Sequence, residues 1–462
     1  MGGITMTFSC CMRPAQPEPK PEPDLEPEPE PAAAQQRPED PELRPEGPRT
    51  DLHSLRAADP ALDALSAHIQ LTVSRTALAT FARRRTLTAA RGGEQAAAAA
   101  VDSLQRDDAE RSAALRGQRI LVTGSAGYVG AALCLALGGL GAEAVGLDVV
   151  QAETVAIEAD VADAEAVRAA VAGCDGILHT AARHAPHAAH YHESDFIATN
   201  VAGTQNVLDA AVAAGGIPVV HTSTTSLTIT KRVKAAEKAG RIVWLDESAQ
   251  PPVDATDSDD PLDRPRNKYG RSKLEAERRC VKAAAAGLPC AIVRISRCFP
   301  EDVLPEEVLP GKGALPRSHS VPPAAAALST PNFKANELLG RRVALLDALA
   351  GHLRALTRAR EPAVQGRVLT LSAPFPWDRS TTPTDDAAFG DFVREQRPRL
   401  AALYAQLGWL LPESIGRVYD SSRAVDVLGW RPAVTFDALV AALGGEAGAK
   451  GISLEDAEAG RY

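Results

Sequence analysis

The chain has 462 residues, 45% of them hydrophobic and 4% aromatic, enough for two domains or for one domain with long additions. Its formal charge of −9 is uneven: residues 1–50 hold ten carboxylates and five basic residues, which leaves −4 on the remainder. A nearly neutral body behind an acidic tail argues against a nucleic-acid-binding protein.

The first 117 residues differ in composition from the rest. Residues 1–50 alternate Pro with Glu, as in PEPKPEPDLEPEPEP, which predicts a disordered tail because too little apolar surface can be buried. Residues 51–117 are Ala-rich and predict a helical appendage. Its basic stretch 71–93 has the composition of a targeting helix but lies far from the start, which favours a solvated helix. The seven scattered cysteines contain no Cys-x-x-Cys pair, so a reducing, cytoplasmic location is expected.

From Gln118 onward, short β-type runs alternate with helical runs. The expected strands are 119–123, 143–148, 176–181, 217–222, 290–295 and 367–372, and helical stretches such as 199–214 and 270–286 lie between them. This alternation predicts an α/β fold, a doubly wound parallel sheet with helices on both faces. The uncharged stretch 120–142 is long enough to span a bilayer, but its six glycines favour a strand, a turn and a helix.

The first candidate site is a glycine turn between an expected strand and an expected helix. Gly124, Gly127 and Gly130 would let the backbone approach a pyrophosphate, which the helix N-terminus then faces with unpaired N–H groups. Asp148 ends the next strand, where a ribose-binding acid belongs. Because no Arg or Lys directly follows Asp148, NAD is favoured over NADP.

The second candidate site is Tyr269-Gly270-Arg271-Ser272-Lys273. Residues four apart share a helix face, so Tyr269 and Lys273 are either a catalytic pair or two surface side chains that meet by chance. The spacing alone does not decide between them.

With the glycine turn before it, the Tyr-x-x-x-Lys pair makes the chain resemble the extended short-chain dehydrogenase/reductase family, also called the NAD-dependent epimerase/dehydratase family. The resemblance covers about residues 118–445. Further matching stretches are EADVAD (158–163), LHTAA (178–182), ATNVAGTQNVLDAA (198–211), VVHTSTTS (219–226) and YDSSRAVDVLGWRP (419–432). The resemblance implies a Rossmann-like NAD domain over 118–297, a smaller mixed substrate-binding region with a returning strand over 298–445, and a C-terminal tail over 446–462.

The resemblance also implies which residues act. Tyr269 would take a proton from a substrate hydroxyl, with Lys273 favouring the phenolate and holding the nicotinamide ribose. Thr224 would orient the reacting oxygen, although it could instead cap a strand end. The implied NAD contacts are Gly124, Gly127, Tyr128, Val129, Gly130, Asp148, Asp160, Val161, Ala181, Asn200, Tyr269 and Lys273.

The chain departs from the family pattern after Thr224. Dehydratases of this family often place an Asp-Glu pair there, whereas this chain has Thr225 and Ser226, which argues against a sugar 4,6-dehydratase reaction. A Pro- and Asp-rich insert of about 40 residues then separates the strand from the Tyr-x-x-x-Lys helix. We expect it to border the substrate pocket and its WLDE section to be ordered.

Two further groups are candidate substrate contacts. His184 and His187 follow LHTAA, where the family faces its substrate; the alternatives are surface residues or, because no obvious further ligand is present, less plausibly a metal pair. No metal site is expected. Arg297 and Arg342 could bind a phosphate or carboxylate, or form ion pairs with Glu301, Glu337 or Asp347.

Three functions stay open. The first is an NAD-dependent epimerase or dehydrogenase acting on a hydroxyl of a sugar-like or nucleotide-linked substrate. The second is a hydroxysteroid-type or dihydroflavonol-type oxidoreductase, and the third is a non-catalytic NAD-binding scaffold or sensor, which would need none of Thr224, Tyr269 and Lys273. The expected partners are a small-molecule substrate and a second copy of the chain in a homodimer, with no nucleic acid and no membrane span.

Overall fold

The computed structural model describes residues 96–106, 109–184, 191–248, 262–298 and 330–444. All of them belong to one compact unit, His68–Tyr462. The predicted tails over 1–50 and 446–462, most of the predicted appendage over 51–117, and His187 lie outside the described residues.

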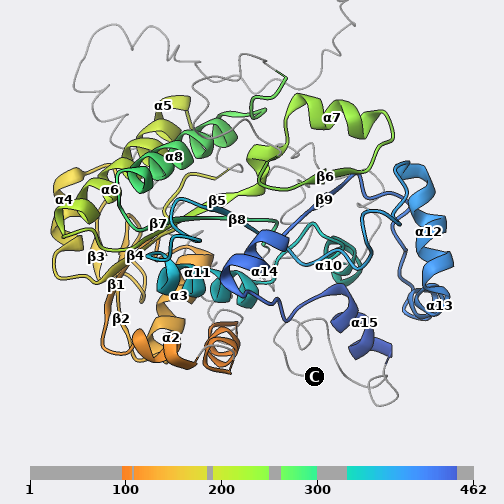
Figure 1. Ribbon diagram of the computed structural model, residues 1–462, viewed down its shortest axis with the longest axis horizontal. Helices are drawn as coiled ribbons and strands as arrows, with labels where there is room; N and C mark the ends of the chain where they lie inside the picture. Colours follow the sequence, from red (N-terminus) through yellow and green to blue (C-terminus); the bar gives the residue numbers. More distant parts are fainter. Residues whose placement is uncertain (1–95, 107–108, 185–190, 249–261, 299–329, 445–462) are drawn as a thin grey trace, which may run out of the picture. The chain divides into compact units, whose positions relative to one another are not determined.

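Seven parallel strands form the central sheet in the order β3-β2-β1-β4-β5-β7-β8 (Figure 1). Their bounds are β1 Arg119–Thr123, β2 Glu143–Asp148, β3 Ile157–Glu158, β4 Gly176–His179, β5 Val219–Thr224, β7 Cys290–Ile295 and β8 Val368–Leu371. Five of the six predicted runs contain one of these strands and the sixth, 217–222, overlaps β5, so the predicted doubly wound parallel sheet is confirmed.

Helices cover both faces of this sheet because successive strand residues point to opposite sides. On one side, α4 (Ala164–Val171), α6 (Gly203–Ala213) and α8 (Lys268–Ala285) pack on Leu121, Ile177 and Ile292. On the other side, α3 (Tyr128–Gly139), α11 (Leu345–Arg358) and α14 (Ser422–Leu428) pack around Ile120, Leu178 and Val220 (Figure 1). Helix 96–106 and α2 (Ala109–Ala114) lie outside this second layer.

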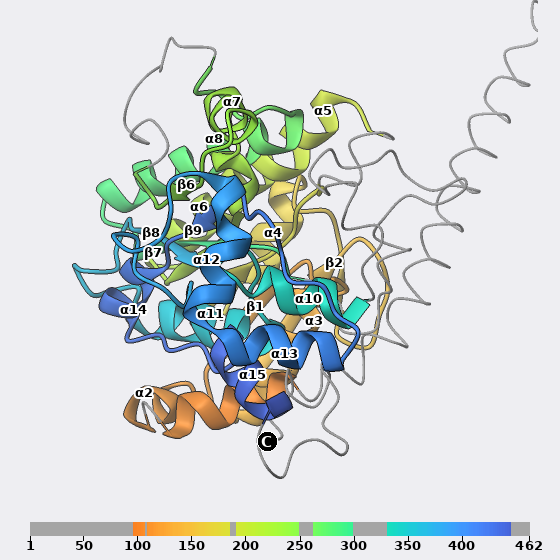
Figure 2. The same cartoon turned by 90° about the vertical axis from the view of Figure 1, so that its right-hand side faces the viewer.

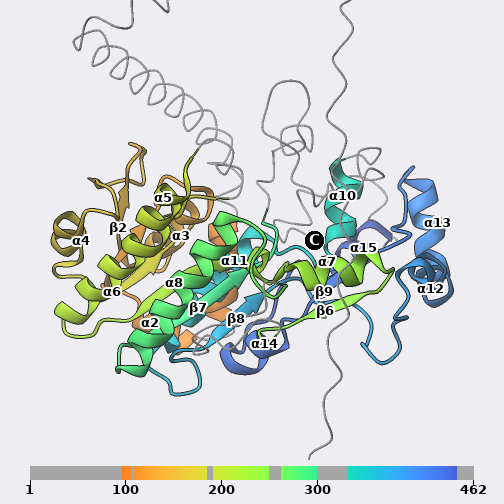
Figure 3. The same cartoon turned by 90° about the horizontal axis from the view of Figure 1, so that it is seen from above.

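A second, smaller group of elements follows the sheet. Strands β6 (Val243–Leu245) and β9 (Arg417–Tyr419) form a separate two-stranded parallel sheet. The other elements of this region are α7 Lys231–Lys238, α10 Thr330–Glu337, η5 Asp386–Ala388, α12 Phe389–Gln396, α13 Pro398–Gln406 and α15 Phe436–Gly444, and Figures 2 and 3 show its helices. Trp244, Phe375, Trp377, Phe389 and Phe392 pack together here, with ring centroids 5.3–6.3 Å apart. These rings belong to or pack against the buried cluster that also lies between the sheet and α3 and α11, so the region shares the core of the sheet.

The structure also answers two expectations about local segments. Residues 120–142 form a strand, a glycine turn and a helix, as predicted, and within the described ranges no helix is both long and apolar enough to cross a bilayer. The WLDE section of the insert is ordered, because Trp244 and Leu245 lie in β6. The sequence did not predict α7, which begins after Thr230, whose side chain accepts a hydrogen bond from the backbone N–H of Val233.

Candidate functional site

The candidate site lies where the strands of a parallel sheet end, the edge at which open α/β sheets bind ligands. Gly124 follows β1, Asp148 ends β2, Ala181 follows β4 and Thr224 ends β5. Three short elements complete this edge: α5 (Glu193–Phe196), the π-helix η2 (Ile197–Ala202) and the 3-10 turn η3 (Thr225–Thr228).

The glycine turn forms a cradle that side chains would fill. Gly124 has φ +73°, and a Cβ there would lie 2.7 Å from the backbone N of Ala181. A Cβ on Gly130 would lie 2.2 Å from the carbonyl oxygen of Gly124. Gly127 caps α3 without a side chain, and the first turn of α3 has no acidic residue. The close approach that the glycines permit and the positive end of the helix dipole therefore fit the pyrophosphate of NAD.

Asp148 ties β2 to this turn. Its carboxylate accepts hydrogen bonds from the backbone N–H groups of Ala126 and Val150, both at 3.0 Å. Burial raises the pKa of Asp148, and these two hydrogen bonds partly oppose the rise. Each carboxylate oxygen keeps a second lone pair, so a ribose hydroxyl could still donate to it.

The predicted adenine residues lie beyond β3. Asp160 accepts a hydrogen bond from the backbone N–H of Ala162 at 2.9 Å. The side chain of Val161 is buried, and a Cβ on Gly203 would lie 2.7 Å from it. Gly203 thus lets α6 approach the loop that carries Asp160 and Val161.

The structure brings Thr224 and Tyr269 together. Helix α8 begins at Lys268, where the side chain of Asn267 caps it by accepting a hydrogen bond from the N–H of Gly270 at 2.8 Å. This cap places Tyr269 in the first turn, buried, with Thr224 as its neighbour. Burial raises the pKa of Tyr269 to about 12, and the side chain of Thr224 acts in the opposite direction.

Lys273 lies one turn further along α8 and is also buried. Its Nζ donates to the carbonyl oxygen of Thr222 at 2.7 Å and lies 3.0 Å from Nε2 of His221. Burial lowers the pKa of Lys273 to about 8. The ammonium is thus hydrogen-bonded to β5, and the expectation that Lys273 favours the phenolate of Tyr269 stays a prediction.

Asn200 joins the loop after β4 to α8. Its Oδ1 accepts from the backbone N–H of Arg183 at 2.7 Å, and its Nδ2 donates to the carbonyl of Arg183 at 3.1 Å and to Oγ of Ser272 at 2.9 Å. Asn200 lies in the π-helix η2, a rare element that is frequent at functional sites. Sequence reasoning placed Asn200 near the centre but missed Ser272, which stands inside the Tyr-x-x-x-Lys motif.

The predicted substrate contacts have different surroundings. The exposed His184 lies beside Tyr269, with ring centroids 6.0 Å apart. Arg297 forms an ion pair with Glu337 at 2.6 Å, the structural alternative that the sequence left open. The side chain of Arg342 is completely buried, and its contact with a substrate stays a prediction.

A buried ion pair joins α8 to strand β7 of the sheet. Arg294, in β7, makes two hydrogen bonds to Glu277 of α8, at 2.9 and 2.6 Å, and neither side chain is more than 1% exposed. Glu277 is one turn after Lys273, so this pair fixes the angle of α8 on the sheet. No local sequence pattern predicts this ion pair, because the partners are 17 residues apart.

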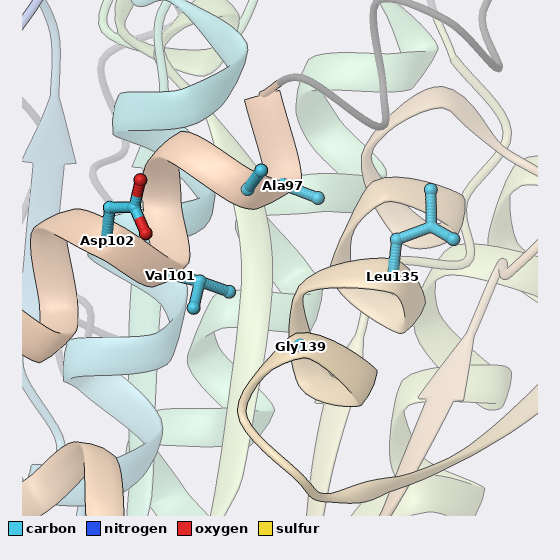
Figure 4. Close-up of a pocket in the computed structure, with 6 residues that line it drawn as sticks. Ala97, Val101, Asp102, Leu135 and Gly139 are labelled. Carbon is cyan, nitrogen blue, oxygen red and sulfur yellow. The ribbon is translucent and has the colours of Figure 1, made fainter.

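A surface pocket of about 260 Å³ lies elsewhere in the described part of the chain. It is lined by Ala97, Ala98, Val101, Asp102, Leu135 and Gly139, between helix 96–106 and α3 (Figure 4). Leu135 and Gly139 lie at the C-terminal end of α3, whereas the glycine turn lies at its N-terminal end. The pocket is therefore separate from the candidate site.

Comparisons with known proteins were made over the whole chain. Residues 120–306 match the model of the NAD dependent epimerase/dehydratase family. No curated protein matches the chain.

Several solved structures are similar to the chain. A short-chain dehydrogenase/reductase superfamily protein from Agrobacterium tumefaciens with bound NAD is 23% identical, with a TM-score of 0.45, over 69% of this chain and 94% of that one. The dTDP-glucose 4,6-dehydratase DesIV from Streptomyces venezuelae is 21% identical, with a TM-score of 0.44, over 69% and 94%. Uronate dehydrogenase from Agrobacterium tumefaciens is 20% identical, with a TM-score of 0.42, over 70% and 86%.

The matched segment contains both halves of the candidate site, from the glycine turn to the Tyr-x-x-x-Lys helix. Residues 120–306 of this chain are therefore similar to the NAD-dependent epimerase/dehydratase family.

Proposed function

We propose that the protein is an NAD-dependent epimerase or dehydrogenase that oxidises a hydroxyl of a sugar-like or nucleotide-linked substrate. The observation that carries this proposal is the buried Tyr269 next to Thr224 at the end of β5, beside a glycine cradle that fits a pyrophosphate. An NAD-binding scaffold would need the cradle but not a buried tyrosine next to a second hydroxyl at the strand ends.

The cofactor contacts follow from the positions of the residues. The backbone at Gly124, Gly127 and Gly130, with Tyr128 and Val129 in the first turn of α3, would hold the pyrophosphate. Asp148 would accept from the ribose, and Asp160 and Val161 would border the adenine. Ala181 and Asn200 would face the nicotinamide half. Bound NAD would supply the hydride acceptor.

The protein's own residues would manage the proton. Tyr269, as the phenolate, would take the proton of the substrate hydroxyl, and Thr224 would hold the same oxygen in line. Since burial raises the pKa of Tyr269 to about 12, the phenolate needs a nearby positive charge, and Lys273 is the candidate one turn away.

The residues after Thr224 limit the type of reaction. Thr225 and Ser226 stand where an acid–base pair for elimination would be required, and hydroxyl groups are poor acids and bases at neutral pH. This favours oxidation or epimerisation over dehydration. The exposed His184 beside Tyr269 would contact the substrate.

The test is turnover of Tyr269→Phe and Thr224→Val on a panel of uronates, nucleotide sugars and hydroxysteroids at saturating NAD. Both variants should lose at least about a hundredfold in kcat, the usual contribution of a positioned acid–base group. Tyr404→Phe is a matched control, because Tyr404 is buried and bonds Asn336 far from the strand ends. Unchanged turnover of Tyr269→Phe would overturn the proposal. Net NADH formation would indicate a dehydrogenase, and retained NAD without net reduction an epimerase.

A further inference from the structure

His221 of strand β5 lies on the face covered by α8, where it contacts Lys273. Nε2 of His221 lies 3.0 Å from Nζ of Lys273, and both side chains are buried. The rings of His221 and His179 lie side by side, 5.2 Å apart, because the two residues are register partners in β5 and β4.

The hydrogen bonds of His179 determine its tautomer. The hydroxyl of Thr204 donates to the carbonyl of Asn200 at 2.7 Å, so its oxygen accepts from Nε2 of His179 at 3.0 Å. Nδ1 of His179 then accepts from the hydroxyl of Thr123 at 2.7 Å. Both nitrogens are satisfied in the neutral form, so His179 acts as a structural residue.

His221 differs from its neighbour. Its Nδ1 is buried and has no hydrogen-bond partner among the described residues. An unsatisfied buried nitrogen destabilises the folded state, and an apolar side chain would fill this strand position without that cost. Folding alone therefore does not account for a histidine here.

The charged and titratable groups around His221 keep it neutral. Lys273 approaches from α8, His179 from β4 and His352 from α11, while Cys280 and Glu277 of α8 act on Lys273. Burial, followed by the positive charge of Lys273, holds the pKa of His221 well below its usual range. A neutral imidazole with its proton on Nδ1 presents Nε2 as an acceptor, and an ammonium group is the donor that it meets.

We propose that His221 is a positioning residue for Lys273: its Nε2 and the carbonyl oxygen of Thr222 hold the ammonium in its charged form and fix two of its three N–H bonds. The third N–H is left for the tyrosine and the cofactor. This role rests on the proposed function of Lys273. It explains both the choice of histidine and the burial of a lysine that must remain protonated.

The test measures the pKa of Lys273 directly, by carbon NMR of lysine labelled at Cε in the full chain without substrate. Lys273→Arg assigns the signal among ten lysines. His221→Leu should lower the pKa of Lys273 by about one unit or more, since it removes a hydrogen bond to a charged group. His221→Gln, which can place an amide oxygen near the same point, should restore most of the shift.

A matched control is His352→Leu, another buried histidine, whose Nε2 bonds Thr222 rather than Lys273; it should leave the Lys273 titration unchanged. If His221→Leu titrates like the parent protein, the proposal is overturned. Nitrogen NMR of the unmutated protein gives a second answer that needs no variant, because a proton found on Nε2 of His221 would equally refute it. Both readouts are independent of turnover, so failure of the proposed function would be seen separately.

Discussion

The glycine cradle can be tested by one added methyl group. In Gly130→Ala the new Cβ would lie 2.2 Å from the carbonyl oxygen of Gly124 and 2.9 Å from Oγ1 of Thr180. Atoms do not approach so closely, so the turn must move. Gly124 has little freedom to do so, because its N–H donates to Leu147 at 2.8 Å and its oxygen accepts from Gly127 at 2.9 Å.

The size of the effect follows from overpacking. An extra methyl in a filled site costs about 1–3 kcal/mol, and a factor of ten in affinity corresponds to about 1.4 kcal/mol. We therefore expect Gly130→Ala to bind NAD about tenfold to a hundredfold more weakly. The free energy of unfolding should fall by up to about 3 kcal/mol.

Titration calorimetry with NAD measures the first effect and chemical denaturation the second. Gly138→Ala is the matched control: it makes the same change in the same helix, where nothing lies within 4 Å of the new Cβ. It should keep the affinity for NAD and gain up to about 1 kcal/mol of helix stability. If Gly130→Ala binds NAD like the parent protein, or if both variants lose affinity alike, the cradle does not hold the pyrophosphate.

Three other predictions concern the surroundings of the site. Arg294→Met should lower the free energy of unfolding by about 3–5 kcal/mol in urea denaturation, because it leaves Glu277 buried without a partner; adding Glu277→Leu should recover most of the loss, and no recovery would contradict the ion-pair argument. Asn267→Ala should cost about 0.5–2 kcal/mol by removing the cap of α8 and should reduce kcat more than it raises KM; an unchanged kcat would show that the cap does not position Tyr269. Burial raises the pKa of Asp148, and the ribose hydroxyl needs an ionised acceptor, so the affinity for NAD should fall as the pH is lowered through this raised pKa. Calorimetry should place that fall at a higher pH than an ordinary carboxyl would give. Asp148→Asn should remove the pH dependence, and a dependence that persists would exclude Asp148 as its source.

The sheet could be predicted from sequence because its signals are local. Residues 119–123 and 143–148 are short apolar runs followed by turn residues, and β1 and β2 have those bounds. The shorter β3 was missed because Ile157–Glu158 has only two residues and shows no periodicity. The predicted helix 199–214 is present, but it begins as the π-helix that carries Asn200, a change of winding that side-chain spacing does not reveal.

The surroundings of the catalytic pair depended instead on contacts between distant residues. His221 is 52 residues from Lys273, and Asn200 is 72 from Ser272, so neither pairing has a local pattern. His221 is one of four polar residues in the strand VVHTST, so no signal in the sequence marks it out. The ion pair of Arg297 with Glu337 was one of two alternatives that the sequence could not separate.

The electrostatics of the site also differ from what spacing alone suggests. A tyrosine and a lysine four residues apart predict an ammonium that stabilises a phenolate, yet burial raises the pKa of Tyr269 to about 12 and lowers that of Lys273 to about 8. Both shifts oppose the charged pair that the proposed chemistry needs. The groups that act in its favour are the hydroxyl of Thr224 on the tyrosine and the acceptors of Thr222 and His221 on the lysine, and all three lie on β5. Strand β5 is therefore as much a part of the site as α8, because it supplies the polar contacts that make a buried Tyr-x-x-x-Lys pair able to carry charge.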